Sequence, residues 1–279
     1  MSVWVIASLT FREASRRKIL LAATLFGLLF LGIYALGLSQ IQKEINLQSR
    51  SMPTLVVSEL FNFILMAGLY VVNFLSVAMT VLTSVDTLSG EISSGTIQTL
   101  VSKPVRRWEI LFGKWLGFAG MLSLYLLLMA GGVMLVASLT LGYTAPNALR
   151  GLGLMWLNLI LLLGVSFLGG TFLSTLANGV LVFGLYGIAF IGGWIEQFGS
   201  FLENQTAVNI GILCSLILPA EALWKRAAYE MQSPIAGAMG NFSPFSAQSV
   251  PSPLMVGYAI LYAMAALIFA IRQFNQRDL

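Results

Sequence analysis

Long apolar runs are the feature that most restricts what this chain can fold into. Six stretches of about eighteen residues or more are rich in Leu, Ile, Val, Phe and Ala and almost free of charge. A helix needs roughly 20 mostly apolar residues to cross a bilayer once. The chain of 279 residues is 58% hydrophobic and only 9% charged, whereas a soluble domain is about 25% charged. The sequence therefore predicts an all-α, polytopic membrane protein.

The apolar runs predict six transmembrane helices within one membrane domain that covers residues 1–279. The second of these helices is unusually long and is interrupted by Asn62 and Asn73. Helices longer than about 25 residues tilt in the bilayer or project beyond its hydrocarbon core. The predicted spans are residues 19–38, 55–85, 108–141, 152–176, 180–198 and 254–271.

Two further segments are predicted to lie at the membrane surface or to enter it only partly. Residues 1–17 place Trp4, Ala7 and Phe11 on one helical face and Arg12 on another, which is typical of an interfacial helix; alternatively, they only begin the first span. Residues 199–253 form an extracytoplasmic segment, in which the apolar run 207–218 ends at Pro219 and is short for a crossing. We expect a re-entrant or interfacial helix there, with a seventh crossing through 208–223 as the alternative, and a surface helix over 221–232.

The distribution of Lys and Arg predicts the orientation of the chain. With the N-terminus inside, ten of the 15 Lys and Arg residues fall in inner segments, as the positive-inside rule requires. We therefore expect both termini in the cytoplasm and a location in the plasma or inner membrane of a prokaryotic cell. The net charge of +4 is explained by this asymmetry, so no nucleic-acid partner is predicted.

A basic loop over residues 86–107 is the most distinctive polar segment. Gly95 and Pro104 bracket a short segment, 96–102, with an apolar stripe, and Pro104 disfavours helix at the residue before it. Arg106 and Arg107 follow where anionic headgroups lie, and tryptophans at 108 and 115 would anchor the third span at the interface. The loop is predicted to form a short amphipathic helix on the cytoplasmic surface.

The loop resembles the first inner loop of type-2 ATP-binding-cassette (ABC) exporter permeases, and most closely that of the branch described as multicopper-enzyme-maturation permeases. The resemblance rests on an acidic residue, Gly-Thr, a short apolar turn, Lys-Pro, a basic pair and then Gly-Lys. It implies that two permease chains, identical or different, form the pathway and that two separate ABC ATPase subunits dock beneath them through a coupling helix. By position, the contact would be lined by Glu91, Gly95, Thr96, Lys103, Pro104, Arg106 and Arg107. The second inner loop, 175–179, is too short to add much coupling surface.

The chain itself carries no recognisable catalytic motif. Gly113-Lys114 is followed by Trp115 and lacks the upstream glycine of a phosphate-binding loop, so ATP and Mg²⁺ are expected on a partner chain. With no His and one Cys, neither a disulfide nor a Cys/His metal site can form within the chain. Ser166 has no histidine to activate it and is predicted to be a packing residue.

Polar and small residues within the spans allow two interpretations each. Asn62 and Asn73 are predicted either to line a substrate path or to find partners in the protein, and Glu59 and Glu196 to lie near span ends where water reaches them. Pairs of glycines permit close helix approach, for core packing or for subunit contact; they are 113/117, 169/170, 184/187 and 192/193. The alternative functions are an ATP-independent secondary transporter or channel, which would carry ionisable residues in mid-span, and a membrane scaffold.

Overall fold

The computed structural model describes residues 3–48, 53–93, 106–233 and 249–277. All regular structure in these ranges is helical, and six of the helices are long and apolar enough to cross a membrane. The predicted all-α architecture with six candidate spans is thereby confirmed. These helices are α2 (Lys18–Gln48), α3 (Thr54–Ser93), α5 (Arg107–Leu141), α6 (Ala148–Gly170), α7 (Thr175–Phe201) and α11 (Pro253–Gln276).

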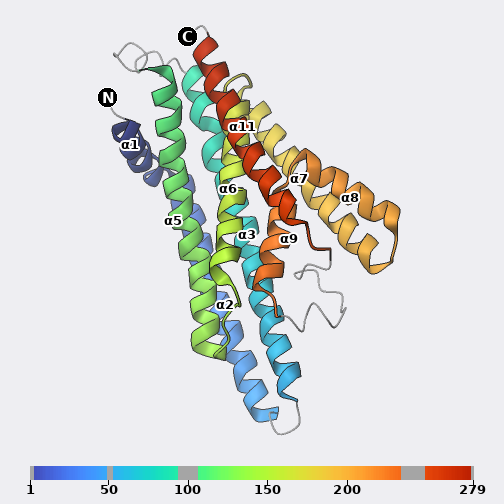
Figure 1. The fold of residues 1–279 in the computed structure, drawn as a ribbon. Helices are drawn as coiled ribbons and strands as arrows, with labels where there is room; N and C mark the ends of the chain where they lie inside the picture. The colour runs from blue at the N-terminus through green and yellow to red at the C-terminus, as the bar shows by residue number, and fades with distance from the viewer. Residues whose placement is uncertain (1–2, 49–52, 94–105, 234–248, 278–279) are drawn as a thin grey trace.

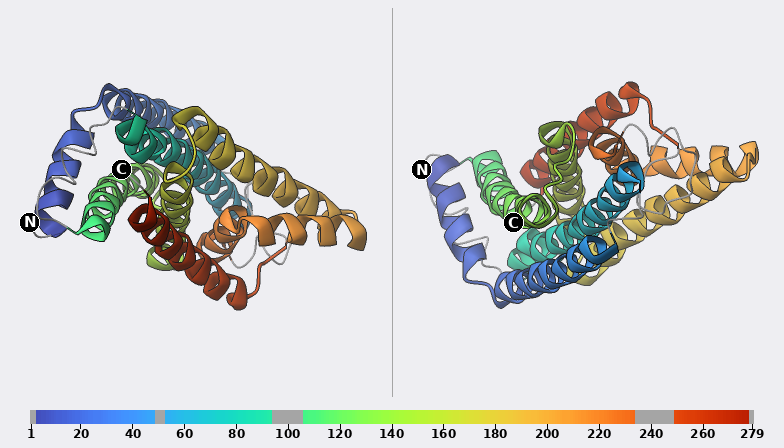
Figure 2. Two further views of the ribbon diagram at one scale, coloured as in Figure 1. Left: turned by 90° about the horizontal axis from the view of Figure 1, so that it is seen from above. Right: turned by 90° about the horizontal axis from the view of Figure 1, so that it is seen from below.

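The long helices form one elongated bundle with α6 near its centre (Figure 1). In the end-on views, α1 (Val3–Ser15) lies across one end of the bundle beside α5, and α7 projects sideways with α8 (Gln205–Ile217) against it (Figure 2). The N- and C-terminal helices lie toward the same end of the molecule, as an even number of crossings requires. We call this the basic end: it contains α1, the start of α5 and the last turn of α11.

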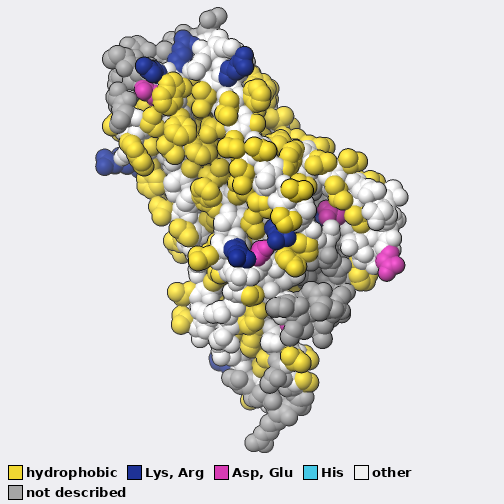
Figure 3. Space-filling model, viewed as in Figure 1, with side chains coloured by type: hydrophobic (Ala, Val, Ile, Leu, Met, Phe, Trp, Pro, Cys, Tyr) yellow, Lys and Arg dark blue, Asp and Glu magenta, His cyan; other side chains and the backbone are white. Residues whose placement is uncertain are grey.

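Burial follows the position of each helix in the bundle. In the most apolar stretch of α6, 67% of the residues are buried. In the corresponding stretch of α2, which lies at the periphery, only 6% are buried. Phe118 of α5 and Phe167 of α6 meet edge to face at 6.1 Å between ring centroids in the core. Outside the core, apolar side chains cover a broad part of the surface below the basic end (Figure 3). Such a large apolar surface is expected where a protein contacts lipid.

The turn between the fourth and fifth spans lies earlier than the sequence predicted. Helix α6 ends at Gly170 and α7 begins at Thr175, so residues 175–179 are the first turns of a helix and not a loop. Ser174 has an extended backbone, φ −68° and ψ 161°, in the position before a helix that serine favours. The sequence did not indicate this boundary, because Phe172 and Leu173 continue the apolar run.

Two helices between α7 and α11 meet at a sharp bend. Helix α8 covers the predicted apolar run, and α9 (Ala220–Met231) follows at an angle of 109°. The prediction that the second helix lies on the surface is wrong. Trp224, Ala227 and Met231 are at most 3% exposed, because α9 packs between α6 and α7 and also contacts α3.

Candidate functional site

The candidate site consists of the two helix ends that flank the basic loop. Helix α3 ends at Ser93 and α5 begins at Arg107, so Glu91 lies in the last turn of the first and Arg107 opens the second. Four predicted coupling residues, and the short helix predicted over 96–102, lie outside the described residues. Those four are Gly95, Thr96, Lys103 and Pro104.

The start of α5 is held by its own first turn and by the end of α11. The backbone N–H of Arg106 donates to Glu109 Oε2 at 3.4 Å, which satisfies a donor that the helix leaves free. Arg107 Nη1 donates to the carbonyl oxygen of Arg277 at 2.5 Å and to that of Asn275 at 3.4 Å. The exit of the loop is therefore attached to the last residues of the sixth span.

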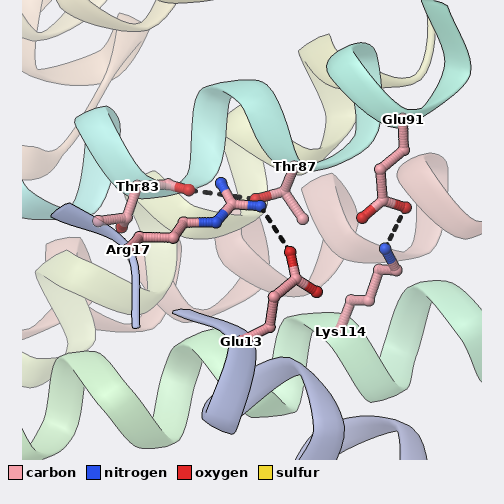
Figure 4. Close-up of polar contacts among 6 residues, drawn as sticks. All are labelled: Glu13, Arg17, Thr83, Thr87, Glu91 and Lys114. Atoms are coloured by element: carbon pink, nitrogen blue, oxygen red, sulfur yellow. Dashed lines mark hydrogen bonds and ion pairs between the residues drawn. The ribbon is translucent and has the colours of Figure 1, made fainter. Parts of the chain in front are cut away.

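A buried ion pair joins the two helix ends across the loop. Lys114 Nζ donates to Glu91 Oε2, and the two side chains are 6% and 17% exposed. Figure 4 shows the glutamate reaching from α3 toward the lysine of α5. A buried lysine needs a partner because an unpaired charge in a low-dielectric interior costs several kcal/mol. Glu91 is therefore paired with Lys114, a contact that the sequence analysis did not predict.

Helix α1 packs on α5 beside this ion pair, and two glycines allow the close approach. A Cβ at Gly113 would lie 2.8 Å from Cβ of Ile6, and one at Gly117 would lie 2.8 Å from the carbonyl oxygen of Ala7. Trp4, which the sequence placed on the same face as Ala7, is 78% exposed, whereas Ala7 is buried. The predicted N-terminal helix is thus present with one face on α5, and its location at a membrane interface stays a prediction.

The connection between α1 and α2 also reaches α3. Arg17 forms an ion pair with Glu13 at 3.0 Å, and its guanidinium points toward Thr83 and Thr87 of α3 (Figure 4). The Thr87 hydroxyl donates to the carbonyl oxygen of Thr83 at 3.1 Å. The N-terminal helix, the end of α3 and the start of α5 therefore form one assembly around the loop.

This packing predicts that Gly117→Ala destabilises the protein. The added methyl group would meet backbone and Thr10 atoms at 2.8 Å, and overpacking costs about 1–3 kcal/mol. The matched control is Gly131→Ala in the same helix, where no neighbouring atom lies within 4 Å and alanine gains up to about 1 kcal/mol. Thermal unfolding of the two purified variants in detergent measures the difference. Equal midpoints would contradict the described contact between α1 and α5.

The turn between α6 and α7 contacts the same end of α3. Thr175 Oγ1 donates to Asp86 Oδ1 at 3.1 Å and lies 3.0 Å from the Ser89 hydroxyl. Asn178 Nδ2 donates to the carbonyl oxygens of Val85 at 3.2 Å and Ser166 at 3.0 Å. Although this turn is short, it is connected through α3 to the basic loop.

A row of buried polar groups extends from this point along α3. The Ser84 hydroxyl donates to Ser166 Oγ at 2.7 Å, which fits the predicted packing role of Ser166. Asn73, 2% exposed, accepts at Oδ1 a hydrogen bond from Asn158 Nδ2 at 3.3 Å. These contacts join α3 to α6, because a polar group in a membrane interior must find a partner within the protein.

Asn62 lies at the other end of this row and is also buried, at 3% exposure. Its Oδ1 accepts from the Tyr143 hydroxyl at 3.3 Å and from the backbone N–H of Ser233 at 3.0 Å. Burial, and to a smaller extent the Glu59 carboxylate, raises the pKa of Tyr143, so its hydroxyl remains a donor at neutral pH. Asn62 thus connects α3 to the α5–α6 connection and to the residues that follow α9.

Comparison with known families gives one match, which covers nearly the whole chain. Residues 4–279 match the family model described as ABC-2 family transporter protein. The chain belongs to the ABC-2 transporter family. It is accordingly a multi-pass permease, the membrane component of a transporter and not a catalytic enzyme. The comparison with curated proteins gave no match.

The permease contains one buried charged cluster that the sequence analysis missed. Lys225 of α9 lies 2.9 Å from Glu196 of α7, and the two side chains are 4% and 6% exposed. Glu221, one turn earlier on α9, is 4% exposed, and its Oε2 has no hydrogen-bond partner among the described residues. The predicted water access for Glu196 is therefore wrong. Glu221 and Lys225 are four residues apart, which places both on one helical face, but this spacing is also common on exposed helices and did not indicate burial.

Glycines bring α7 close enough to α8 and α9 to enclose this cluster. A Cβ at Gly193 would lie 2.3 Å from Cγ of Glu221, and one at Gly192 would lie 2.2 Å from Cβ of Cys214. The free Cys214 therefore packs against a helix as a small residue. By contrast, Gly184 and Gly187 on α7 have no neighbouring atom within 4 Å, so this pair serves no packing within the described part of the permease.

Proposed function

We propose that the chain is the membrane-spanning subunit of an ATP-driven exporter and that separate ABC ATPase subunits drive it through residues 86–107. Membership of the ABC-2 family supports a permease that works with an ATPase. The loop residues at 91, 95, 96, 103, 104, 106 and 107 support coupling by their resemblance to exporter permeases. The chain lacks a phosphate-binding loop, so ATP and Mg²⁺ would be bound by the partner.

The Glu91–Lys114 ion pair is the observation that carries this proposal. It connects the end of α3 to the start of α5 on either side of the loop, and Arg107 attaches the same point to the end of α11. A force applied to the loop would therefore reach three spans through short polar contacts. A loop that only fixed topology by its positive charge would need none of these contacts.

The remaining parts of the proposal concern orientation and assembly. The basic end would face the cytoplasm, with both termini there, in the plasma or inner membrane of a prokaryotic cell. A second permease chain, identical or different, would complete the pathway, and the open pair Gly184 and Gly187 on α7 supports a helix contact outside the described chain. The narrower resemblance to multicopper-enzyme-maturation permeases stays a prediction, as does a substrate path past Asn62 and Asn73.

An ATP-independent transporter remains the second candidate because of the buried cluster in α7 and α9. Buried ionisable residues such as Glu196, Glu221 and Lys225 are typical of ion-coupled transporters. The two functions differ in whether the permease needs an ATPase.

The proposal is tested by co-purifying the permease with a soluble ABC ATPase and by measuring whether ATP hydrolysis depends on transport. We expect Thr96→Asp to leave the permease folded but to lower transport-dependent ATP hydrolysis about tenfold, because a charge placed in a docking surface costs about 1.4 kcal/mol or more. The matched control is Thr206→Asp, an exposed threonine at the start of α8, which should retain wild-type hydrolysis. Transport by the purified permease with no ATPase present would overturn the proposal and favour the second candidate.

A further inference from the structure

An amphipathic groove opens at the basic end between the last turns of α11 and the end of α6. Its volume is about 410 Å³, and it is lined by Leu168, Phe172, Phe269, Arg272, Gln273 and Gln276. The four α11 residues are spaced i, i+3, i+4 and i+7, so they share one face of the helix. Phe172 and Phe269 are 53% and 57% exposed. The groove therefore has apolar walls and a polar rim with a single cationic side chain.

Hydrogen bonds between the two walls fix the shape of this groove. Arg277 Nη1 donates to the carbonyl oxygen of Thr171, which ties the residue after α11 to the residue after α6. Arg107 donates to the carbonyl oxygens of Arg277 and Asn275 from the side of α5. The groove is thus preformed, since neither wall can move without breaking a charge-assisted hydrogen bond.

The charge at the rim has no counter-ion among the described residues. Arg272 is exposed and forms no ion pair or side-chain hydrogen bond in the described ranges. Arg107 and Arg277 add positive charge nearby, and within the described ranges their side chains donate to carbonyl oxygens. Figure 3 shows Lys and Arg side chains at the same end of the molecule, above the apolar surface.

We propose that this groove binds one anionic phospholipid from the leaflet that faces the basic end. The lipid phosphate would pair with the Arg272 guanidinium, and the Gln273 and Gln276 amides would donate to headgroup oxygens. The first part of an acyl chain would lie against Phe172 and Phe269. Arginine in a pocket between membrane helices is suited to this role, because its planar guanidinium binds phosphate through two parallel hydrogen bonds.

The apolar walls favour a lipid over a soluble phosphate compound. A free phosphate would use the arginine but would leave the exposed rings of Phe172 and Phe269 without an apolar partner. A phospholipid supplies that partner, because the first methylenes of its acyl chain can contact both rings. The level of the groove also suits a headgroup, since Arg272 directly follows the apolar run of α11.

Native mass spectrometry of the delipidated permease in detergent tests the site. Dioleoyl phosphatidylglycerol is added, and the bound fraction is compared with that of dioleoyl phosphatidylcholine and of glycerol 3-phosphate. We expect preferential binding of phosphatidylglycerol and a loss of about fivefold in Arg272→Gln, since a basic residue near a headgroup contributes about 1 kcal/mol. Arg272→Lys should retain most of the binding because it keeps the charge.

The matched control is Arg12→Gln, which removes one exposed positive charge from α1 at the same end of the molecule. An equal loss in this variant would overturn the proposal, because it would mean that net charge alone attracts the lipid. Equal binding of phosphatidylcholine, or comparable binding of glycerol 3-phosphate, would overturn it as well. Unfolding midpoints of all variants, measured in the same detergent, show that each protein is folded.

Discussion

Lys225→Met is expected to lower the free energy of unfolding by about 3–5 kcal/mol, which is the cost of breaking a buried ion pair from one side. Without the ammonium group, the Glu196 carboxylate would remain buried and charged, and the Ser249 hydroxyl would still donate a hydrogen bond to it. Glu221 on the same helical face would also lose its nearest compensating charge. Thermal unfolding in detergent should show a midpoint about 10 °C lower.

Two further variants separate charge from packing in this experiment. Arg150→Met removes a cation that is 75% exposed and lies 3.8 Å from Glu230, and such surface pairs contribute less than about 1 kcal/mol. The double variant Glu196→Gln with Lys225→Met should recover part of the lost stability, because the Glu196 side chain is then no longer a buried charge without its cation. A Lys225→Met midpoint no lower than that of Arg150→Met would contradict the buried pair.

Glu91→Gln is expected to have the largest effect on function. The substitution removes the carboxylate that pairs with the Lys114 ammonium, and the Lys114 side chain is only 6% exposed. The ion pair between the end of α3 and the start of α5 is therefore lost. We expect transport-dependent ATP hydrolysis to fall about tenfold, equivalent to about 1.4 kcal/mol of lost coupling, while the ATPase still co-purifies. The measurement is ATP hydrolysis by the purified complex with and without a transported substrate.

Substitution of the partner residue, Lys114, provides one control for this prediction. Lys114→Gln breaks the same pair from the other side, and the charge-swapped double variant Glu91→Lys with Lys114→Glu should restore part of the coupling. Glu109→Gln changes a carboxylate that only caps α5 and should reduce hydrolysis less than Glu91→Gln. Equal effects of Glu91→Gln and Glu109→Gln would mean that the ion pair has no special role.

The apolar runs predicted the transmembrane helices well, because the bilayer requires mostly apolar side chains along the whole of each span. Residues 108–141 were predicted as a span, and α5 runs from Arg107 to Leu141. The N-terminal helix was also predicted, because apolar residues such as Trp4, Ala7 and Phe11 recur with helical spacing. For α5 the surrounding medium determines the pattern, whereas the buried face of α1 packs on a specific partner, α5.

Specific partners explain what the sequence did not predict. The burial of α9 depends on α3, α6 and α7, and its own mixture of Glu, Lys, Arg and Ala is typical of a surface helix. The position of Glu196 near the end of α7 indicated water access, whereas Lys225 from another helix occupies the space beside it. Pairings of residues distant in sequence leave no periodic pattern. For the coupling loop, Glu91, Arg106 and Arg107 could be placed, and the other four residues lie outside the described ranges.

The length of α3 makes it suited to act as a lever. Its 40 residues form one unbroken helix, which corresponds to about 60 Å at 1.5 Å per residue, roughly twice the hydrocarbon thickness of a bilayer. Glu91 lies near one end of this rod, and Asn62, about two turns from the other end, accepts a hydrogen bond from Ser233, two residues after α9. A tilt of a few degrees at the basic end would therefore displace the far end by several ångströms. Such a rod would convert a small movement at the loop into a larger one on the opposite side of the membrane.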